Sequence, residues 1–457
     1  MVSNYCFKIT NKQQRLGKDK TFFIRTYGCQ ANERDSEIIK AILLKIGFKE
    51  IKDFNKNVDL VILNTCAIRQ NAENKVFGLL EQLKKKKETR KIKYFGICGC
   101  VAQQPQIIKR LKVKISNIDF FMGTNNIIDL PHILEMVMLK DKQVSRIDKM
   151  KSALVENWPN YRETRHKALV NIMYGCNNYC SYCIVPYVRG PIRSRTKENI
   201  LDEVKCLIKN GCKEITLLGQ NVNSYGIDLK QNYTFANLLE DVAKTKIPRI
   251  RYATSNPWNF TKEIIDVMAK YKNIMPYIHL PIQSGDETIL KLMNRTMKVK
   301  DFIALIKYAR KKIPCLTVST DLIVGFPNET NKQFRKTLKL YKKIKFDNAY
   351  TFIYSARPNT PASKIIDKVA LKTKQKRLTK LNKLVKKYSK WNNNKYITNV
   401  VQVLVDGQSK TNKNIFTGYS HNWKVVNFVG QAKIGDIVNV KITSSSLFSL
   451  NGEKISC

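Results

Sequence analysis

The stretch Leu169-Val-Asn-Ile-Met-Tyr-Gly-Cys-Asn-Asn-Tyr-Cys-Ser-Tyr-Cys-Ile184 starts as an apolar strand and ends in a loop with three cysteines. Cys176, Cys180 and Cys183 have the spacing C-x3-C-x2-C. Three thiolates on one short loop can hold three irons of a [4Fe–4S] cluster and leave the fourth iron open for a substrate or cofactor. A zinc site needs a fourth ligand, and no nearby Cys or His completes this loop. The loop therefore predicts an open iron–sulfur cluster at the end of a strand.

Strand and helix patterns alternate around this loop, from about residue 166 to 392. The predicted strands are Leu169–Met173, Ile215–Leu218, Ile250–Ala253, Tyr277–Leu280, Leu316–Val324 and Ala349–Tyr354. The predicted helices between them include Lys197–Lys209, Thr261–Tyr271, Val299–Lys311 and Lys332–Lys343. Six such units are fewer than the eight of a closed (β/α) barrel, so we expect an open six-unit barrel with the cysteine loop on its catalytic face.

The region before it, roughly residues 20–130, also alternates strand and helix. Predicted strands are Thr21–Tyr27, Val58–Asn64 and Ile92–Ile97, with helices at about Arg34–Ile46 and Ala72–Lys87. This βαβαβ order predicts an α/β domain with a parallel sheet and helices on its faces.

Three further cysteines, Cys29, Cys66 and Cys100, each follow the C-terminal end of a different predicted strand. Ligands bind at this edge of open parallel sheets. A single cysteine there would most simply be a buried thiol. Three at equivalent positions favour a second three-cysteine cluster. Cys98 would lie on the same strand face as Cys100, so spacing alone does not choose between these two.

The end of the chain changes character. Short strands at Val400–Gly407, Asn414–Gly418, Val425–Gly430 and Asp436–Thr443 predict a small antiparallel β-barrel. Such barrels often bind nucleic acid through exposed aromatic and basic side chains. The candidates are Lys413, Phe416, Tyr419, Trp423 and Lys424, although the aromatics suit a core equally well. We therefore expect three domains, at residues 20–130, 162–392 and 395–457.

The chain of 457 residues has a formal net charge of +46, from 63 Lys and 19 Arg against 36 acidic residues. This excess fits a nucleic-acid partner, and it fits the lysine-rich composition of an AT-rich genome equally well. The basic helix predicted at Thr373–Lys390 favours a solvated charged face over a dedicated RNA contact. No secretory signal or long apolar run occurs, so we expect a cytoplasmic protein without membrane segments, whose cysteines serve metal chemistry.

Polar residues follow several of the barrel strands, at the end where a cofactor or substrate would bind. The candidates are Gln220, Asn221, Ser255, Gln283 and Ser319. Each alone is weak, because strand-to-helix loops use Asn and Ser for caps and turns. His279, in an apolar strand, suits a satisfied core histidine. No Ser/His/Asp triad, P-loop or HExxH motif occurs.

Several motifs together resemble the methylthiotransferases of the radical S-adenosylmethionine group. Cys176-x3-Cys180-x2-Cys183 is similar to the radical S-adenosylmethionine signature. Three segments resemble the N-terminal domain of the family: Thr26–Glu37, Asn64–Glu73 and Gly99–Gln103. Two others resemble its barrel motifs: His279–Gly285 and Asp321–Pro327. The C-terminal barrel is similar to a TRAM domain, an RNA-binding module. The resemblance covers nearly the whole chain.

Within the family, Gly28-Cys-Gln-Ala-Asn32 and Leu217–Tyr225 resemble the MiaB branch. The resemblance implies a transferase that adds a methylthio group to C2 of N6-isopentenyladenosine at tRNA position 37, beside the anticodon. It implies two [4Fe–4S] clusters, with Cys29, Cys66 and Cys100 as ligands of the auxiliary one and Cys98 excluded. Pro191–Arg193 lacks the acidic residue expected after Arg189-Gly190, and Asn256 stands where His is expected.

The resemblance further implies that the open iron binds S-adenosylmethionine, which on one-electron cleavage yields a 5′-deoxyadenosyl radical. The auxiliary cluster would hold the sulfur, and a second S-adenosylmethionine would supply the methyl group. Expected partners are the tRNA anticodon stem-loop and a reductant such as flavodoxin or ferredoxin, with the enzyme a monomer. Alternatives are methylthiolation of N6-threonylcarbamoyladenosine in tRNA, a non-catalytic iron–sulfur RNA-binding protein, and a zinc-stabilised RNA-binding protein.

Overall fold

The computed structural model describes residues 5–54, 56–66, 78–79, 81–83, 85–89, 91–114, 117–148, 155–156, 158–159, 161–230, 232–409 and 412–455. The chain divides into two compact units, each built from several segments. The first contains Met1–Glu163, Asn171–Asn177 and Cys183–Ile200, and the second contains Thr164–Val170, Asn178–Tyr182 and Leu201–Cys457. Within the described residues, no helix is both long and apolar enough to cross a membrane.

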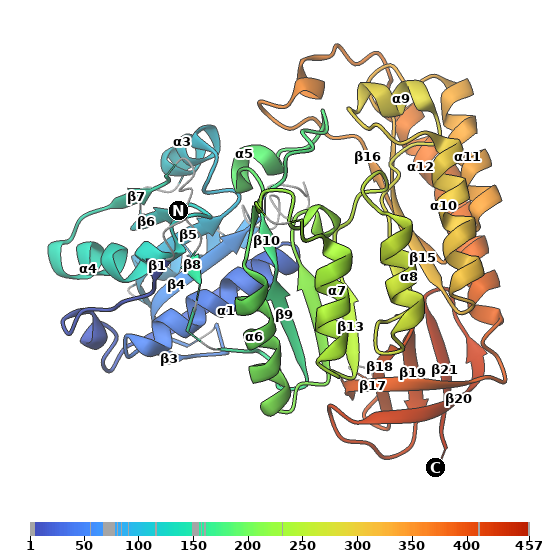
Figure 1. Ribbon diagram of the computed structural model, residues 1–457. Helices are drawn as coiled ribbons and strands as arrows, with labels where there is room; N and C mark the ends of the chain where they lie inside the picture. The colour runs from blue at the N-terminus through green and yellow to red at the C-terminus, as the bar shows by residue number, and fades with distance from the viewer. Residues whose placement is uncertain are drawn as a thin grey trace. The chain divides into compact units, whose positions relative to one another are not determined.

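The first unit is built on a six-stranded parallel sheet, in blue to teal in Figure 1, with the order β3-β2-β4-β5-β6-β7. Its strands are β2 (Thr21–Tyr27), β3 (Lys49–Glu50), β4 (Val58–Thr65), β5 (Ile92–Gly99), β6 (Phe120–Met122) and β7 (Val144–Arg146). Its helices include α1 (Gln30–Lys45), α3 (Pro105–Lys114) and α4 (Leu130–Lys140). Short strands β1 (Tyr5–Cys6) and β8 (Val155–Glu156) pair with each other.

Each face of this sheet has its own core, because successive side chains of a strand point to opposite faces. Phe22 packs with α1 and α4 on one face, and its neighbour Phe23 packs with α3 on the other. The three predicted strands are confirmed. Of the helix predicted at Ala72–Lys87, residues 78–79, 81–83 and 85–87 are helical, and 72–77, 80 and 84 lie outside the described residues.

The second unit contains the six predicted barrel strands in two three-stranded sheets, ordered β13-β12-β9 and β14-β15-β16. The strands are β9 (Lys167–Asn171), β12 (Glu214–Leu218), β13 (Arg249–Tyr252), β14 (Tyr277–His279), β15 (Thr317–Val324) and β16 (Asn348–Ile353). The helices that alternate with them are α6 (Lys197–Lys209), α7 (Phe235–Lys244), α8 (Lys262–Lys270), α9 (Glu287–Leu292), α10 (Val299–Lys312), α11 (Asn331–Ile344) and α12 (Leu371–Asn394).

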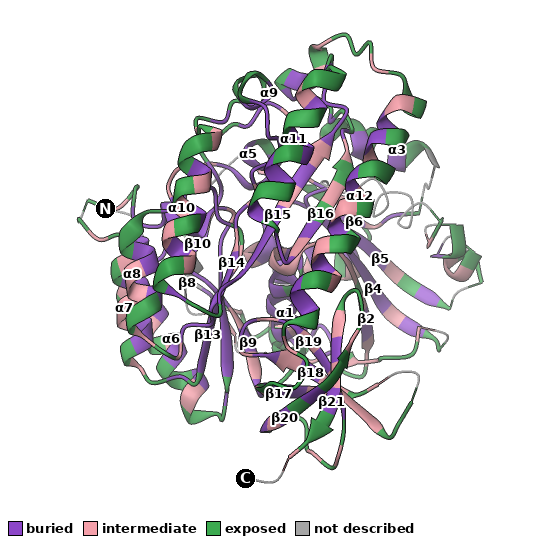
Figure 2. Cartoon of the chain, turned by 90° about the vertical axis from the view of Figure 1, so that its right-hand side faces the viewer, coloured by how far each residue is buried: buried purple, intermediate pink, exposed green. Residues whose placement is uncertain are grey.

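The barrel strands follow one another in sequence order across each sheet, which confirms the βα repeat. Pro276 and Pro281 bound the short strand β14, because proline lacks the N–H that would extend the ladder. The helices keep their apolar sides on the strands and turn their exposed sides outward, as Figure 2 shows for α10 and α11.

The C-terminal residues of the second unit form the predicted closed barrel, with the order β17-β18-β19-β21-β20. Its strands are β17 (Val400–Gln408), β18 (Ile415–Ser420), β19 (Val425–Val429), β20 (Ile437–Ser445) and β21 (Ser449–Lys454). The fifth strand, β21, was not predicted. It pairs antiparallel with β20 but parallel with β19, so the barrel is not purely antiparallel.

A buried arginine ties this small barrel to the (β/α) strands of the same unit. Arg249 on β13 pairs with Glu214 on β12 at 3.1 Å, and the two side chains are 1% and 2% exposed. The Arg249 guanidinium also donates to the backbone carbonyls of Tyr419 and Ser420, at 3.0 and 2.6 Å. One guanidinium thus joins two parallel strands to β18.

Replacing Arg249 with Met is expected to lower the free energy of unfolding by about 3–5 kcal/mol, because Glu214 would be left as an unpaired buried charge. The double variant Arg249→Met/Glu214→Leu should lose less than the single variant, since it removes both charges. Urea unfolding followed by tryptophan fluorescence measures the difference. Equal losses in the two variants would contradict this account.

Candidate functional site

The three cysteines after the N-terminal strands lie at one edge of the first unit's sheet. Strands β2, β4 and β5 are neighbours in the sheet, and Cys29, Cys66 and Cys100 follow them directly. Cys29 also begins α1 as its N-cap. The Cys29 thiol forms a hydrogen bond with Cys66, which together with the positive charge of Arg189 lowers the pKa of Cys29 to about 5, against the effect of burial. The three cysteines thus follow three neighbouring strands at one sheet edge, and their role as cluster ligands stays a prediction.

A network of amides holds this edge together. Asn32 accepts a hydrogen bond from the backbone N–H of Cys29 (3.3 Å) and donates to Asn64 Oδ1 (3.1 Å). Asn64 in turn donates to Ser36 Oγ and to the carbonyl oxygen of Asn32, both at 2.9 Å. The network links α1 to β4 and fixes the positions from which Cys29 and Cys66 project.

The turn before Cys100 requires a glycine. Gly99 has φ +89°, and a Cβ there would lie 2.4 Å from Asn64 Oδ1 and 2.5 Å from the carbonyl oxygen of Thr65. Any larger residue would therefore collide with the neighbouring strand end. This close approach brings Cys100 to the same edge as Cys66.

Arg189, at the end of α5 (Val185–Arg189), is buried against these thiols. It pairs with Asp35 at 2.7 Å, with both side chains 6% exposed, and its Nε donates to Cys100 Sγ at 3.3 Å. Burial raises the pKa of Cys100 while the charge of Arg189 opposes that rise. Burial also raises the pKa of Cys98.

The loop with Cys176, Cys180 and Cys183 lies between β10 (Met173–Tyr174) and α5. Cys176 and Cys180 are buried, and Cys183 is half-buried. Its first part is pinned by the backbone: Cys176 N–H donates to the carbonyl of Gly190 at 2.9 Å. Gly175 has φ +73°, and a Cβ there would lie 1.8 Å from the Pro191 carbonyl oxygen. The backbone path into the loop thus depends on glycine.

In the second unit, another buried arginine contacts this loop. Arg295 is 7% exposed and lies within hydrogen-bond distance of Cys180 Sγ (3.5 Å) and Tyr182 Oη (3.2 Å). Ser181 donates from its hydroxyl to the Leu292 carbonyl at 2.7 Å. The segment around α9 therefore positions the middle of the loop.

No set of three His, Cys, Asp or Glu side chains within the described residues has the spacing that holds a single metal ion. A cubane cluster is larger than one ion, so its thiolates stand further apart than the ligands of an ion. Each set has three thiols, one of them beside a buried arginine, and such a donor set fits a [4Fe–4S] cluster.

Four of the five predicted pocket residues, Gln220, Asn221, Ser255 and Gln283, follow the C-terminal ends of barrel strands, whereas Ser319 lies within β15 near its start. Asn221, Ser255, Gln283 and Ser319 are buried, and Gln220 is half-buried. Ser255 donates to the His279 carbonyl at 2.6 Å, so its hydroxyl is already used. Asn221 Oδ1 and Gln283 Oε1 are buried and accept no hydrogen bond from the described residues. Unsatisfied buried acceptors at this face suit a polar ligand with N–H or O–H donors.

His279 is satisfied within the protein, as predicted. Its Nδ1 lies 2.8 Å from Ser319 Oγ, and its Nε2 lies 3.5 Å from Asp321 Oδ1. Ser319 Oγ also contacts Tyr277 Oη at 2.8 Å. Ser319 therefore serves this internal network and is less available to a ligand than Asn221 or Gln283.

Most of the candidate nucleic-acid residues of the small barrel are used in packing. Lys424 is buried and pairs with Asp347 at 2.8 Å. Tyr419 and Trp423 stack with ring centroids 4.1 Å apart, and the Arg251 guanidinium lies 3.6 Å from the Trp423 centroid. Tyr419 and Trp423 are half-buried and Lys424 is buried, so these three residues take part in contacts with β13 and with Asp347, just before β16.

Comparison with protein families matches three parts of the chain. Residues 170–341 match the Radical SAM superfamily, residues 21–123 match the Uncharacterized protein family UPF0004, and residues 394–455 match the TRAM domain. The chain is 53% identical over 454 residues to the tRNA-2-methylthio-N(6)-dimethylallyladenosine synthase of Malacoplasma penetrans, covering 98% of this chain and 92% of that one. The chain belongs to this synthase family. A Staphylococcus haemolyticus synthase of the same name is 46% identical, covering 98% and 88% of the two chains.

Solved structures show the fold that this synthase family shares with other radical enzymes. The radical S-adenosylmethionine methyltransferase TsrM from Kitasatospora setae superimposes with a TM-score of 0.55 at 12% identity, covering 75% of each chain. The cobalamin-dependent radical enzyme OxsB gives a TM-score of 0.51 at 11% identity, over 81% of this chain and 56% of that one. At these identities the likeness concerns the fold alone.

Sequence reasoning missed the two arginines that contact the synthase's thiols, Arg189 and Arg295. Their residue type carried a usable signal. Among the described residues eight arginines are buried but only two lysines, although the chain has 63 Lys and 19 Arg. The planar guanidinium of arginine presents several N–H donors in a fixed arrangement, and the ammonium group of lysine cannot replace it at such a contact. In a lysine-rich chain, each arginine is therefore a candidate for a structural or functional contact.

Proposed function

We propose that this protein adds a methylthio group to C2 of N6-isopentenyladenosine in tRNA, with S-adenosylmethionine as the source of the radical and of the methyl group. The activity named for relatives at 53% and 46% identity over nearly the whole chain carries this proposal. The gathering of Cys29, Cys66 and Cys100 at one sheet edge supports it, because sulfur insertion needs a second thiol-bound centre.

Two groups of residues would hold the cofactors. Cys176, Cys180 and Cys183 would hold the cluster that binds S-adenosylmethionine, and Cys29, Cys66 and Cys100 would hold the auxiliary cluster. The unsatisfied acceptors of Asn221 and Gln283 suit the donors of S-adenosylmethionine or of the adenine base. When bound and reduced, these groups supply a radical that removes a hydrogen atom from an unactivated carbon, which acid–base groups of the protein cannot do.

The protein's own residues would position and screen this chemistry. Arg189 and Arg295 would donate hydrogen bonds to cluster-bound sulfur, which tunes and orients such centres. Burial of Cys66, Cys98 and Cys100 keeps water from the sheet edge. We further propose that a small electron carrier such as flavodoxin or ferredoxin delivers the electron.

Product analysis tests the function directly. The reconstituted enzyme, S-adenosylmethionine and dithionite are incubated without oxygen with tRNA that carries isopentenyladenosine, and nucleosides are analysed by mass spectrometry. A shifted isopentenyladenosine peak is expected. A shifted threonylcarbamoyladenosine peak would instead assign the sister reaction. RNA binding without any 5′-deoxyadenosine would make the protein a non-catalytic binder, and colourless protein with zinc would exclude both clusters.

A further inference from the structure

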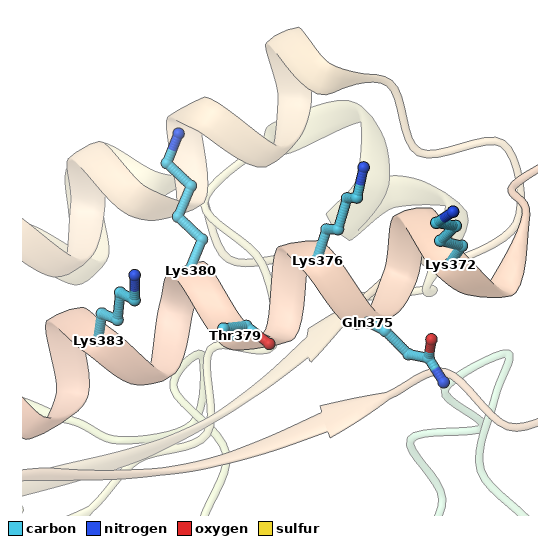
Figure 3. Close-up of a pocket in the computed structure, with 6 residues that line it drawn as sticks. All are labelled: Lys372, Gln375, Lys376, Thr379, Lys380 and Lys383. Carbon is cyan, nitrogen blue, oxygen red and sulfur yellow. The ribbon is translucent and has the colours of Figure 1, made fainter.

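The long helix α12 carries an exposed row of lysines. Figure 3 shows four of them, Lys372, Lys376, Lys380 and Lys383, projecting from the same side of the helix. Together with Gln375 and Thr379 they line a shallow groove on the surface. Their spacing of four, four and three residues keeps them on one face. Within the described part of the chain, none of the four takes part in an ion pair or a hydrogen bond.

Acidic residues are absent from both helices of this surface. Neither α11 nor α12, which pack side by side in the second unit (Figure 1), contains Asp or Glu. The exposed basic residues of α11 are Lys332, Arg335, Lys336, Lys339, Lys342 and Lys343. Nearby carboxylates are already engaged: Glu329 with Arg377, Asp367 with Lys374, and Asp286 with Lys336. The remaining positive charge has no counter-charge on these helices.

The other helices that alternate with the barrel strands, α6 to α10, each contain Asp or Glu. Lys244 on α7 pairs with Asp241 at 3.3 Å, Lys270 on α8 with Glu240 at 2.8 Å, and Lys312 on α10 with Asp266 at 3.1 Å. A general enrichment in lysine would spread over all helices and would not remove acids from two adjacent ones. The contrast therefore distinguishes this surface from the other helices of the second unit.

The position of the row favours RNA. Helix α12 covers the outer side of β16, and its C-terminal end reaches the small barrel, where Asn393 donates to the Ser446 carbonyl at 3.2 Å. Its first residues follow the loop after β16, at the strand ends where the predicted pocket lies. The row thus runs from the catalytic end of the strands toward the TRAM barrel.

We propose that the acid-free face of α11 and α12 binds the sugar–phosphate backbone of the tRNA substrate. Lysine ammonium groups neutralise phosphates without reading sequence, which suits a substrate chosen by one modified base. This inference rests on the proposed function. It takes up the RNA contact that the sequence left as the alternative to a solvated charged face for this helix.

The test compares two variants of the holoenzyme, each with four lysines changed to glutamine, a residue with similar helix propensity. The first carries Lys372→Gln, Lys376→Gln, Lys380→Gln and Lys383→Gln. The matched control carries Lys209→Gln, Lys213→Gln, Lys230→Gln and Lys246→Gln, four exposed lysines elsewhere in the same unit. Binding of isopentenylated tRNA is measured at several salt concentrations.

The α12 variant should bind about 10- to 100-fold more weakly at 0.1 M salt, with the slope of log K against log salt reduced by about three. The control should keep the wild-type slope, and both variants should cleave S-adenosylmethionine at the wild-type rate without RNA. Equal slopes for both variants would overturn the inference while leaving the function intact. A wild-type enzyme that binds no tRNA would overturn both. Lysine-dependent binding to anionic phospholipid vesicles, with tRNA affinity unchanged, would assign the surface to a membrane instead.

Discussion

Anaerobic reconstitution of a Cys29→Ala/Cys66→Ala/Cys100→Ala variant is expected to give about four irons per chain, against about eight for the wild type, because each cubane cluster holds four. The variant should still form 5′-deoxyadenosine with dithionite, since Cys176, Cys180 and Cys183 are intact. It should make no methylthiolated nucleoside. Iron and sulfide analysis and the two product assays measure these three results on one preparation.

Cys98→Ala is the matched control for this experiment. Cys98 lies two residues before Cys100, and the two residues are 1% and 3% exposed. Both substitutions therefore remove a buried thiol from the same strand end. Only the loss of Cys100 should reduce the iron content when each is changed singly. Four irons in both the wild type and the triple variant would make the N-terminal thiols structural, and iron lost on Cys98→Ala would exchange the roles of these two cysteines.

Arg189→Gln is expected to lower the free energy of unfolding by about 3–5 kcal/mol, because Asp35 would be left as a buried, unpaired carboxylate. It should also remove the hydrogen bond to Cys100 Sγ. The double variant Arg189→Gln/Asp35→Asn should recover most of the stability. Urea unfolding of the three proteins measures this part of the effect.

The role of Arg189 beside the proposed auxiliary cluster needs a second measurement, which a purely structural residue would not change. Loss of a positive charge next to a cluster disfavours its reduced form, so Arg189→Gln should make the midpoint potential more negative. Arg189→Lys keeps the charge and should lie closer to the wild type. Potentiometric titration followed by electron paramagnetic resonance compares them. Identical midpoint potentials in all three proteins would mean that Arg189 has only a structural role, through its ion pair with Asp35.

The sequence was most informative where a residue type and a strand end coincide. Apolar runs predicted β2, β4 and β5 closely, and parallel pairing then brought Cys29, Cys66 and Cys100 to one edge. Such placement follows from local pattern and topology. The same reasoning found the six barrel strands.

Contacts between segments distant in sequence could not be predicted in this way. Arg189 meets Asp35 across more than 150 residues, and Arg295 meets Cys180 across 115. The small barrel's aromatics were ambiguous for the same reason: periodicity shows that Trp423 needs a partner, and only the fold shows that Arg251 is that partner. The strand β21 was missed because Asn451-Gly-Glu interrupts its apolar pattern.

The attachment of the TRAM barrel has a consequence for the spacing between that barrel and the strand ends of its unit. Arg249, Lys424 and the end of α12 fix that barrel to the β-strands of its own unit. Its separation from the C-terminal strand ends is then fixed by these contacts, and α12, whose 24 residues span about 36 Å at 1.5 Å per residue, bridges that distance. The barrel and the strand ends are therefore held at a fixed spacing within the unit. Inserting one helical turn into α12 should therefore displace the end of the helix by about 5 Å against the contacts of Arg249 and Lys424, and weaken the attachment of the barrel.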